Sequence, residues 1–397
     1  MITRPGALVL AGSVALAVAG RLLGLVEAYV LAAAGGLLVI VAVAQVLVLQ
    51  PRLRVRRSVR PERVHVGTPA RVEIDVASVG RVATPVLTLV DPIGDRAGAR
   101  LRLAPLPVGG TVRAAYRLPT RTRGEVSVGP LQVEVADPFG LAHRRQVVAD
   151  KVRLVVLPHV DPIRPLPPPA GAEPLSGQEG RPGLGRSGDE FHTLRPYVVG
   201  DDIRRVHWPM SARSDDLVVR QDDEPRQGRL TVVLDVTSAH TSTDGFERMV
   251  SAAASIAAAH WQRGDIVRLL TSDHQDTGWA TGVAAYDNLM EVLAVAARSA
   301  RADLDRVLGL TDAGAHAIVV VTGGRPDADI ATLAGHRARR AGHRAGMTVV
   351  RFLGHAPADR VGGIRGVRIV DVGPSRPFPL VWEDARVRRR TPVGSRP

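Results

Sequence analysis

The spacing of apolar positions changes along the chain and divides it into stretches of different predicted structure. Two long apolar stretches come first, from Ala7 to Val26 and from Ala28 to Leu49, with Arg21 inside the first and Glu27 between them. Each has about the ~20 residues that cross a bilayer as a helix. Because Arg21 and Glu27 favour a tight turn, residues 1–50 are predicted to form a hairpin of two transmembrane helices.

Residues 51–160 follow a period of two. Short alternating runs such as RVEIDVAS and EVSVGPLQVEV are separated by Gly, Pro and Asp, as is typical of strands joined by turns. This pattern predicts an antiparallel, Ig-like β-sandwich. Residues 161–187 are rich in Pro and Gly, which predicts an extended, poorly ordered linker.

Residues 229–397 alternate predicted strands with predicted helices. LTVVLD, DIVRLLT, HAIVVVT and MTVVRFL have the composition of buried strands, and FERMVSAAASIAAAHW and YDNLMEVLAVAARSA have helical spacing. The alternation predicts an α/β domain with a mainly parallel sheet covered on both faces, ending in a basic tail. In such sheets, ligands bind at the carboxyl ends of the strands.

Charge sets the expected orientation of the hairpin. The chain carries 52 Lys and Arg against 39 Asp and Glu, and a cluster of arginines directly follows the second apolar stretch: Arg52, Arg54, Arg56, Arg57, Arg60 and Arg63. Such clusters stay on the cytoplasmic side, so we expect a multi-pass plasma-membrane protein with cytoplasmic soluble domains. A signal peptide cleaved near residues 17–19 is the alternative, in which case the second span still returns the chain to the cytoplasm.

Composition narrows the chemistry. The absence of cysteine excludes disulfides, thiolate zinc sites and a thiol nucleophile. Aromatic residues make up only 3% of the chain, which argues against the stacking surfaces that bind nucleic acids. The sequence also lacks the phosphate-loop, dinucleotide-binding, zinc-protease and nucleophile-elbow motifs. We therefore expect no cofactor and assign no catalytic residue.

One candidate metal site follows the first strand of the α/β region. Asp235 and Thr237 would point oxygens at a magnesium ion, and von Willebrand factor type A domains carry Asp-x-Ser-x-Ser at this place. The second hydroxyl position is Ala239, and Gly323 and Gly324 stand at a strand end where such domains often supply an aspartate. Since Mg²⁺ requires several oxygen ligands, a divalent metal is possible but disfavoured. The alternative is that Asp235 caps a loop or helix.

The most polar part of the chain is the segment 188–228, which includes GDDIRRVHWPMSAR. Its aspartates and arginines suit charge-assisted pairs, so it is predicted to be a structural clamp, a partner surface, or both. As a clamp, DDLVVRQ would pair as an edge strand next to the first strand of the α/β domain, with Trp208 anchoring the packing. A catalytic interpretation would use Asp202, His207 and Ser211 as acid, base and nucleophile.

This segment resembles the signature of the bacterial membrane-protein family catalogued as domain of unknown function 58. The second hallmark of that family resembles RGEVSVGPLQVEVADPFGL, residues 123–141. The resemblance implies a membrane-anchored protein with a type A-like domain that works with MoxR-like AAA+ ATPases and transglutaminase-like membrane proteins. It carries over no catalytic residue. The matching signature positions are Gly188, Glu190, Phe191, Leu194, Arg195, Tyr197, Gly200, Asp201, Asp202, Arg204, Trp208, Ser211 and Arg213.

Together these features predict a non-enzymatic, membrane-anchored adaptor or scaffold that faces the cytoplasm. It would present clients to a MoxR-like ATPase in envelope assembly or complex maturation. Two alternatives stay open: a membrane-proximal hydrolase or ligase acting through the signature segment, and a scaffold that only oligomerises.

Overall fold

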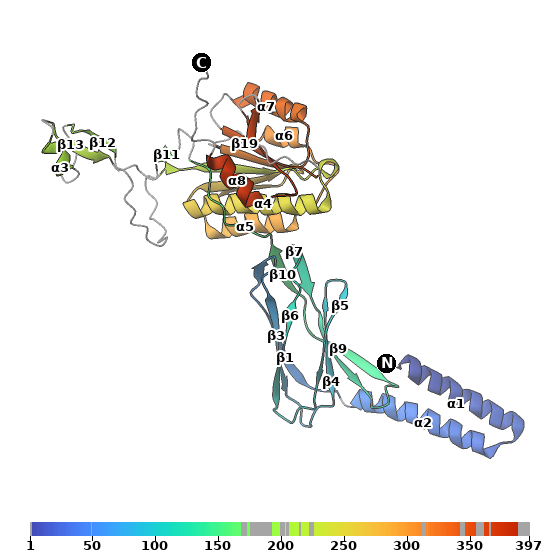
Figure 1. The fold of residues 1–397 in the computed structure, drawn as a ribbon. Helices are drawn as coiled ribbons and strands as arrows, with labels where there is room; N and C mark the ends of the chain where they lie inside the picture. Colours follow the sequence, from blue (N-terminus) through green and yellow to red (C-terminus); the bar gives the residue numbers. More distant parts are fainter. Residues whose placement is uncertain are drawn as a thin grey trace. The chain divides into compact units, whose positions relative to one another are not determined.

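The computed structural model divides into two compact units, Met1–His159 and Val160–Pro397 (Figure 1). The structure describes residues 2–48, 50–167, 173–174, 193–198, 203, 206–213, 216–221, 226–311, 315, 317–341, 346–354, 361–364 and 367–387. Each unit is described separately below.

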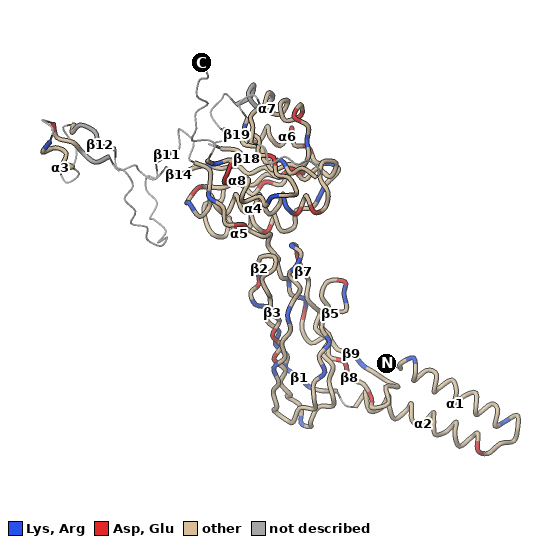
Figure 2. Tube along the Cα trace, in the orientation of Figure 1, with Lys and Arg blue, Asp and Glu red and all other residues tan. Residues whose placement is uncertain are grey.

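The first unit begins with two apolar helices, α1 (Arg4–Leu23) and α2 (Val26–Val48), as the sequence predicted. Both are long and apolar enough to cross a membrane. The charged residues of the hairpin lie near the start of α1 and at the turn between the helices (Figure 2). Small residues let the helices approach, since a Cβ on Gly35 would lie 2.3 Å from the Ser13 Oγ.

The strands of the first unit form two sheets around one apolar core. One sheet has the order β1 (Leu53–Arg60), β3 (Ala70–Ser78), β6 (Thr111–Leu118). The other has the order β2 (Arg63–His65), β10 (Val152–Leu157), β7 (Gly124–Val128), β4 (Leu87–Ile93), β8 (Leu131–Ala136), β9 (His143–Ala149), and β5 (Arg96–Leu103) also pairs with β4. The alternation in β3 turns Val72, Ile74 and Val76 into the core, where they join Leu87 and Leu89 of the other sheet.

A buried ion pair joins these two sheets. The Arg57 guanidinium on β1 lies 2.7 Å from the Asp91 carboxylate on β4, and both side chains are 1% exposed. Tyr116 on β6 donates a 2.7 Å hydrogen bond to the same carboxylate. Burial and the Asp91 charge raise the pKa of Tyr116. One of the six arginines expected to stay in the cytoplasm by charge alone is therefore a core residue.

The second unit contains a seven-stranded sheet in the order β17-β16-β15-β18-β19-β21-β20. The strands β15 (Arg229–Leu234), β16 (Ile266–Thr271), β18 (Ala317–Thr322), β19 (Gly346–Phe352) and β21 (Val367–Val372) are parallel. The edge strands β17 (Asp276–Ala280) and β20 (Val361–Ile364) are antiparallel to their neighbours. The predicted α/β region with a mainly parallel sheet is confirmed at this level.

Helices lie on both faces of this sheet (Figure 1). α6 (Leu304–Leu308) and α7 (Asp327–Ala341) pack on one face in a shared apolar cluster, and α4 (Thr243–Arg263), α5 (Val283–Val295) and α8 (Phe378–Val387) lie on the other. α4 ends at Gly264, whose φ of 97° needs a glycine. Trp382 of α8 is fully buried, so α8 is part of the packed domain.

Candidate functional site

The strand order places a candidate site at the carboxyl ends of β15 and β18. After β15 the chain continues to β16 on one side of it, and later returns to β18 on the other. A crevice at such a reversal is the usual ligand site of an open α/β sheet. The side chains that meet here are Asp235, Thr237, Ser272, Thr322 and Arg325, called the switch-point site below.

Asp235 is the centre of the switch-point site and is 1% exposed. Its Oδ1 accepts hydrogen bonds from the Thr237 amide, the Thr237 hydroxyl and the Ser272 hydroxyl, at 3.0, 2.6 and 3.1 Å. Its Oδ2 accepts from the Thr322 hydroxyl and from the Arg325 Nε, both at 2.7 Å. A carboxylate has about four lone-pair positions, so these five donors saturate it.

Electrostatics keep Asp235 ionised. Burial alone would raise its pKa, but the Arg325 guanidinium and the hydroxyl donors outweigh burial and lower it. Arg325 is held in turn by Arg351, which donates 2.7 Å to the Arg325 carbonyl. Arg351 also forms a two-point pair with Asp371, at 2.7 and 3.0 Å. Arg351 also lies 2.6 Å from Asp327, so the charged side chains at this edge of the sheet form one connected network.

The switch-point site does not fit a divalent metal as the residues stand. Asp235 and Thr237 do come together as the sequence predicted, but the Arg325 guanidinium supplies the positive charge that an ion would bring. Ala239 lies in the short turn η2 (Ser238–His240) and offers no side-chain oxygen. A Cβ on Gly323 would lie 2.2 Å from the His240 carbonyl oxygen, so an aspartate there would displace the backbone. The described residues also contain no cluster of three or more metal-ligating side chains.

The described residues of the signature segment form a two-stranded sheet and one short helix. β12 (Thr193–Pro196) pairs antiparallel with β13 (Val218–Gln221), and the short helix α3 (Trp208–Ser211) lies between them in the chain. The predicted pairing of DDLVVRQ beside the first strand of the α/β domain is wrong. The reason is that β15 pairs with β16 on one side and β18 on the other, which leaves it no free edge.

Two polar side chains of the signature segment bind backbone groups. The Ser211 Oγ accepts 2.9 Å from the Val218 amide, and the His207 Nδ1 accepts 3.1 Å from the Met210 amide. The Ser211 amide donates 3.0 Å to the His207 carbonyl, but no hydrogen bond between the two side chains is found in the described part of the chain. Predicted signature residues outside the described range are Gly188, Glu190, Phe191, Gly200, Asp201, Asp202 and Arg204, and the side chains of Leu194 and Arg195 are also outside it.

Trp208 does not anchor packing as expected. Its side chain is 60% exposed. Other large apolar side chains of the same segment are exposed as well, and they are called the signature patch together with Trp208: Val198, Ile203, Met210 and Leu217. Exposed large apolar side chains mark an interaction surface where they form one contiguous patch.

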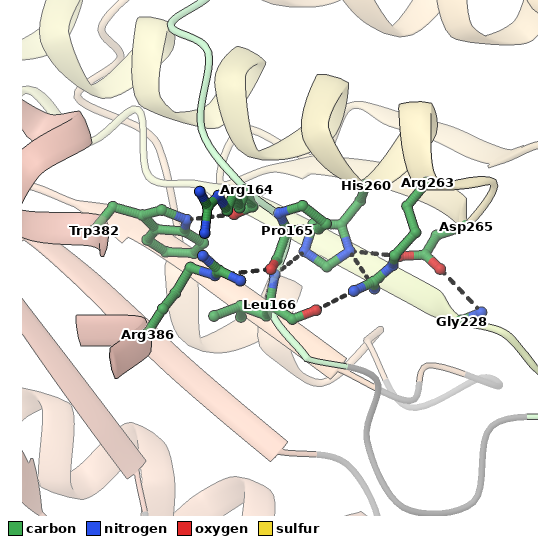
Figure 3. Close-up of polar contacts among 9 residues, drawn as sticks. All are labelled: Arg164, Pro165, Leu166, Gly228, His260, Arg263, Asp265, Trp382 and Arg386. Atoms are coloured by element: carbon green, nitrogen blue, oxygen red, sulfur yellow. Dashed lines mark hydrogen bonds and ion pairs between the residues drawn. The ribbon is translucent and has the colours of Figure 1, made fainter. Parts of the chain in front are cut away.

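The segment 161–166, called the strap below, is bound to the α/β fold, which the sequence did not predict. Residues 161–166, expected to begin a poorly ordered linker, are bound along α4 and α8 (Figure 3). The Leu166 amide donates 3.2 Å to the His260 Nε2, and the Trp382 Nε1 donates 2.9 Å to the Arg164 carbonyl. The Asp161 amide donates 2.9 Å to the Ser255 Oγ.

The strap depends on a buried His–Asp pair. The His260 Nδ1 lies 2.6 Å from the Asp265 Oδ2, with the two side chains 2% and 3% exposed. Burial lowers the pKa of His260 despite the neighbouring carboxylate, so His260 is neutral and its Nε2 is free to accept from Leu166. Asp265 also accepts 3.1 Å from the Gly228 amide, where the chain enters β15.

Comparisons with known proteins give a family model and several distant structural likenesses. Three solved structures resemble parts of the chain: the CARDB domain of a Pyrococcus furiosus protein in complex with di-metal ions (15% identity, 27% of this chain and 89% of that one, TM-score 0.22), a Listeria innocua beta-glucosidase in complex with glucose (13%, 27% and 16%, TM-score 0.21), and the Pseudomonas fluorescens alkylpurine DNA glycosylase AlkC bound to DNA (12%, 33% and 38%, TM-score 0.19). TM-scores this low carry no conclusion for this chain. No curated protein matches it.

The family model described as "Protein of unknown function DUF58" matches residues 193–352. The match runs from β12 in the signature segment through the switch-point site to the end of β19. The match confirms, over these residues, the resemblance to this family that the signature segment indicated.

Proposed function

We propose that this protein is a membrane-anchored adaptor that presents clients to a MoxR-like AAA+ ATPase through the signature patch. The hairpin is its anchor, residues 51–160 are an Ig-like sandwich, and residues 229–397 are a von Willebrand factor type A-like domain. The parallel sheet with Asp235 after β15 is consistent with that last assignment. The partner class comes from the family resemblance.

The observation that carries the proposal is the signature patch. Five large apolar side chains between Val198 and Leu217 are at least 42% exposed. Tryptophan is enriched among the residues that dominate binding energy at protein interfaces. The saturated Asp235 supports a binding role rather than a catalytic one, because the described residues leave its carboxylate no free position for a substrate.

The orientation of the anchor can be tested by single-cysteine labelling, because the natural chain has no cysteine. Glu27→Cys lies at the hairpin turn and Asp329→Cys on the exposed start of α7. With a membrane-impermeant maleimide on intact cells, we expect Glu27→Cys to react, and Asp329→Cys to react only after the membrane is permeabilised. The reverse pattern would place the soluble units outside and remove the ATPase from consideration.

The partner can be tested with purified components. The full chain in nanodiscs should bind the MoxR-like ATPase of the same cell, and Trp208→Ala/Met210→Ala should weaken binding by about thirtyfold, the effect of losing ~2 kcal/mol at a binding hot spot. Surface plasmon resonance measures the two affinities. The matched control is Leu380→Ala/Val387→Ala, which removes exposed apolar side chains from α8. Equal affinity of both variants, or no binding by the natural chain, would contradict the proposal.

A further inference from the structure

The first unit carries two pockets where α2 ends. α2 has 23 residues, about 34 Å of helix, so its last turn reaches the edge of a hydrocarbon layer of about 30 Å. Gln45 and Val46 of that turn line a pocket of about 530 Å³, and Val48 and Gln50 line a second pocket of about 370 Å³. Pro85 lines both pockets, so they lie on either side of one loop.

Each pocket is lined by a pair of arginines. Arg100 and Arg102 on β5 line the larger pocket, and Arg52 and Arg81 line the smaller one. These four residues, the basic rim, are exposed. Arg100 lies 3.2 Å from Glu134, whereas the structure gives Arg81 and Arg102 no side-chain partner among the described residues. Asp137 also lines the larger pocket, but its carboxylate is 5% exposed and accepts from the Phe139 and Ala142 amides at 2.8 and 2.5 Å.

Hydrogen bonds fix the loops around the basic rim. The Val79 amide donates 2.9 Å to the Arg52 carbonyl, directly after the span. The Leu106 amide donates 2.8 Å to the Thr84 Oγ1, which joins the next loop to the same end of the unit. The two pockets are therefore built by a fixed set of loops rather than by a single surface strand.

Large apolar side chains stand beside the basic rim. Val82 and Phe139 are each 68% exposed, and Val108 is 59% exposed. Phe139 lies in the loop of the DPFGL hallmark, which is fastened to the start of α1 because the Thr3 amide donates 2.9 Å to the Leu141 carbonyl. Leu141 and Ala142 of that loop pack on Val39, Ala42 and Val46 of α2. Phe139 is thus held at the same end of the hairpin as the basic rim.

We propose that the basic rim binds the headgroups of anionic phospholipids in the leaflet where α2 ends, with Val82 and Phe139 inserted between the acyl chains. This rests on the proposed membrane anchor. Arginine side chains bind phosphate oxygens at two points, and basic residues within a Debye length of an anionic leaflet are attracted to it. Insertion into the bilayer would remove the exposed apolar side chains from water.

Lipid counting tests the proposal. The detergent-solubilised full chain is incubated with phosphatidylglycerol or phosphatidylcholine, and bound lipids are counted by native mass spectrometry. We expect the natural chain to retain phosphatidylglycerol preferentially, and Arg81→Gln/Arg102→Gln to weaken this retention by about tenfold or more. Arg96→Gln/Arg117→Gln removes the same charge from exposed positions at the other end of the strands and should retain the lipid as the natural chain does.

Two further measurements separate the outcomes. Excess inorganic phosphate should not displace the lipid, and full displacement would make the rim a free-phosphate site. A fluorophore on Phe139→Cys should be quenched by brominated lipid in nanodiscs, whereas one on Asp95→Cys, in the exposed β4–β5 turn, should not. Equal retention of both lipids, or equal loss in both double variants, would overturn the proposal. The lipid count does not depend on which way the hairpin faces, so labelling at Glu27→Cys can fail while the lipid site stands.

Discussion

Asp235→Asn should destabilise the α/β unit by about 3–5 kcal/mol, because it leaves the Arg325 guanidinium without its carboxylate in a nearly closed site. The NH₂ group of the asparagine side chain would also face a hydrogen-bond donor, where the carboxylate oxygen now accepts a hydrogen bond. Urea unfolding of the full chain in detergent, followed by tryptophan fluorescence, measures this loss. All four tryptophans lie at positions 208, 261, 279 and 382, so the signal reports on the second unit alone.

Two matched variants show whether the charge pair is the cause. Thr237→Val removes one hydroxyl donor and no charge, so it should cost only about 1 kcal/mol. Asp235→Asn/Arg325→Gln removes both charges and should be more stable than Asp235→Asn alone, since the residues are directly coupled. If the stability lost by the double variant equals the sum of the losses of Asp235→Asn and Arg325→Gln, the two residues are not coupled and the ion pair is not the source of the effect.

The same urea titration tests whether the switch-point site binds a divalent metal. A bound ion at a hundred times its dissociation constant would add about 2.7 kcal/mol. Since Arg325 occupies the charge position beside Asp235, we expect the urea midpoint of the natural chain to be the same in magnesium and in chelator. A midpoint that rises with magnesium, and does so less in Asp235→Asn, would restore the metal-dependent alternative.

His260→Ala should release the strap, with a loss of about 3 kcal/mol of local stability. The variant leaves the Leu166 amide without an acceptor and takes one donor from the buried Asp265. Hydrogen exchange of the full chain, resolved by peptide, should show lost protection of residues 161–166. Ser255→Ala is the control, because it removes the acceptor of the Asp161 amide, besides a bond within α4 to the Ser251 carbonyl, and should lower protection at that end of the strap alone.

Lowering the pH should also weaken the binding of the strap in the natural chain. Burial lowers the folded-state pKa of His260, whereas in the unfolded chain it titrates near ~6.5. The unfolded state therefore binds more protons below about pH 6.5, and stability falls as the pH drops from there towards the folded-state pKa. Asp265 adds its own loss only at lower pH, below its ordinary carboxyl range, because its pKa is lowered by His260 and Arg263 in spite of burial. Protection factors of the strap should fall between neutral pH and pH ~5.5 in the natural chain, and a flat profile would show that His260 does not control it.

The sequence was sufficient for features that repeat over many residues. The hairpin, the alternating strands and the strand–helix alternation after Arg229 depend on periodicity, and the structure shows helices and strands at those places. Asp235 and Thr237 were found because they directly follow a buried strand. Arg325 was missed because it lies 90 residues away from Asp235, and no local sequence pattern predicts which carboxylate a flexible arginine side chain will bind.

The strap and the pairing of β13 were missed for different reasons. PIRPL has the composition of a linker, and its ordering comes from acceptors on α4 and α8 that lie about 94 and 219 residues away in the sequence. DDLVVRQ has the composition of a strand, but composition does not name its partner, which is β12. Both outcomes depend on long-range contacts that periodicity does not encode.

The strap also gives the signature segment the character of an insertion. The chain leaves the α/β fold at Leu166, bound to His260, and rejoins it at Gly228, bound to Asp265, and these two side chains bind each other. A Cβ on Gly228 would lie 2.8 Å from the Asp265 Oδ1, so the rejoining residue is tied to this arrangement. The ends of the excursion are thus already closed by the host fold, and lengthening or shortening it changes the closure entropy only slowly. Such a loop can diverge, or be grafted between relatives, without refolding the sheet that carries it.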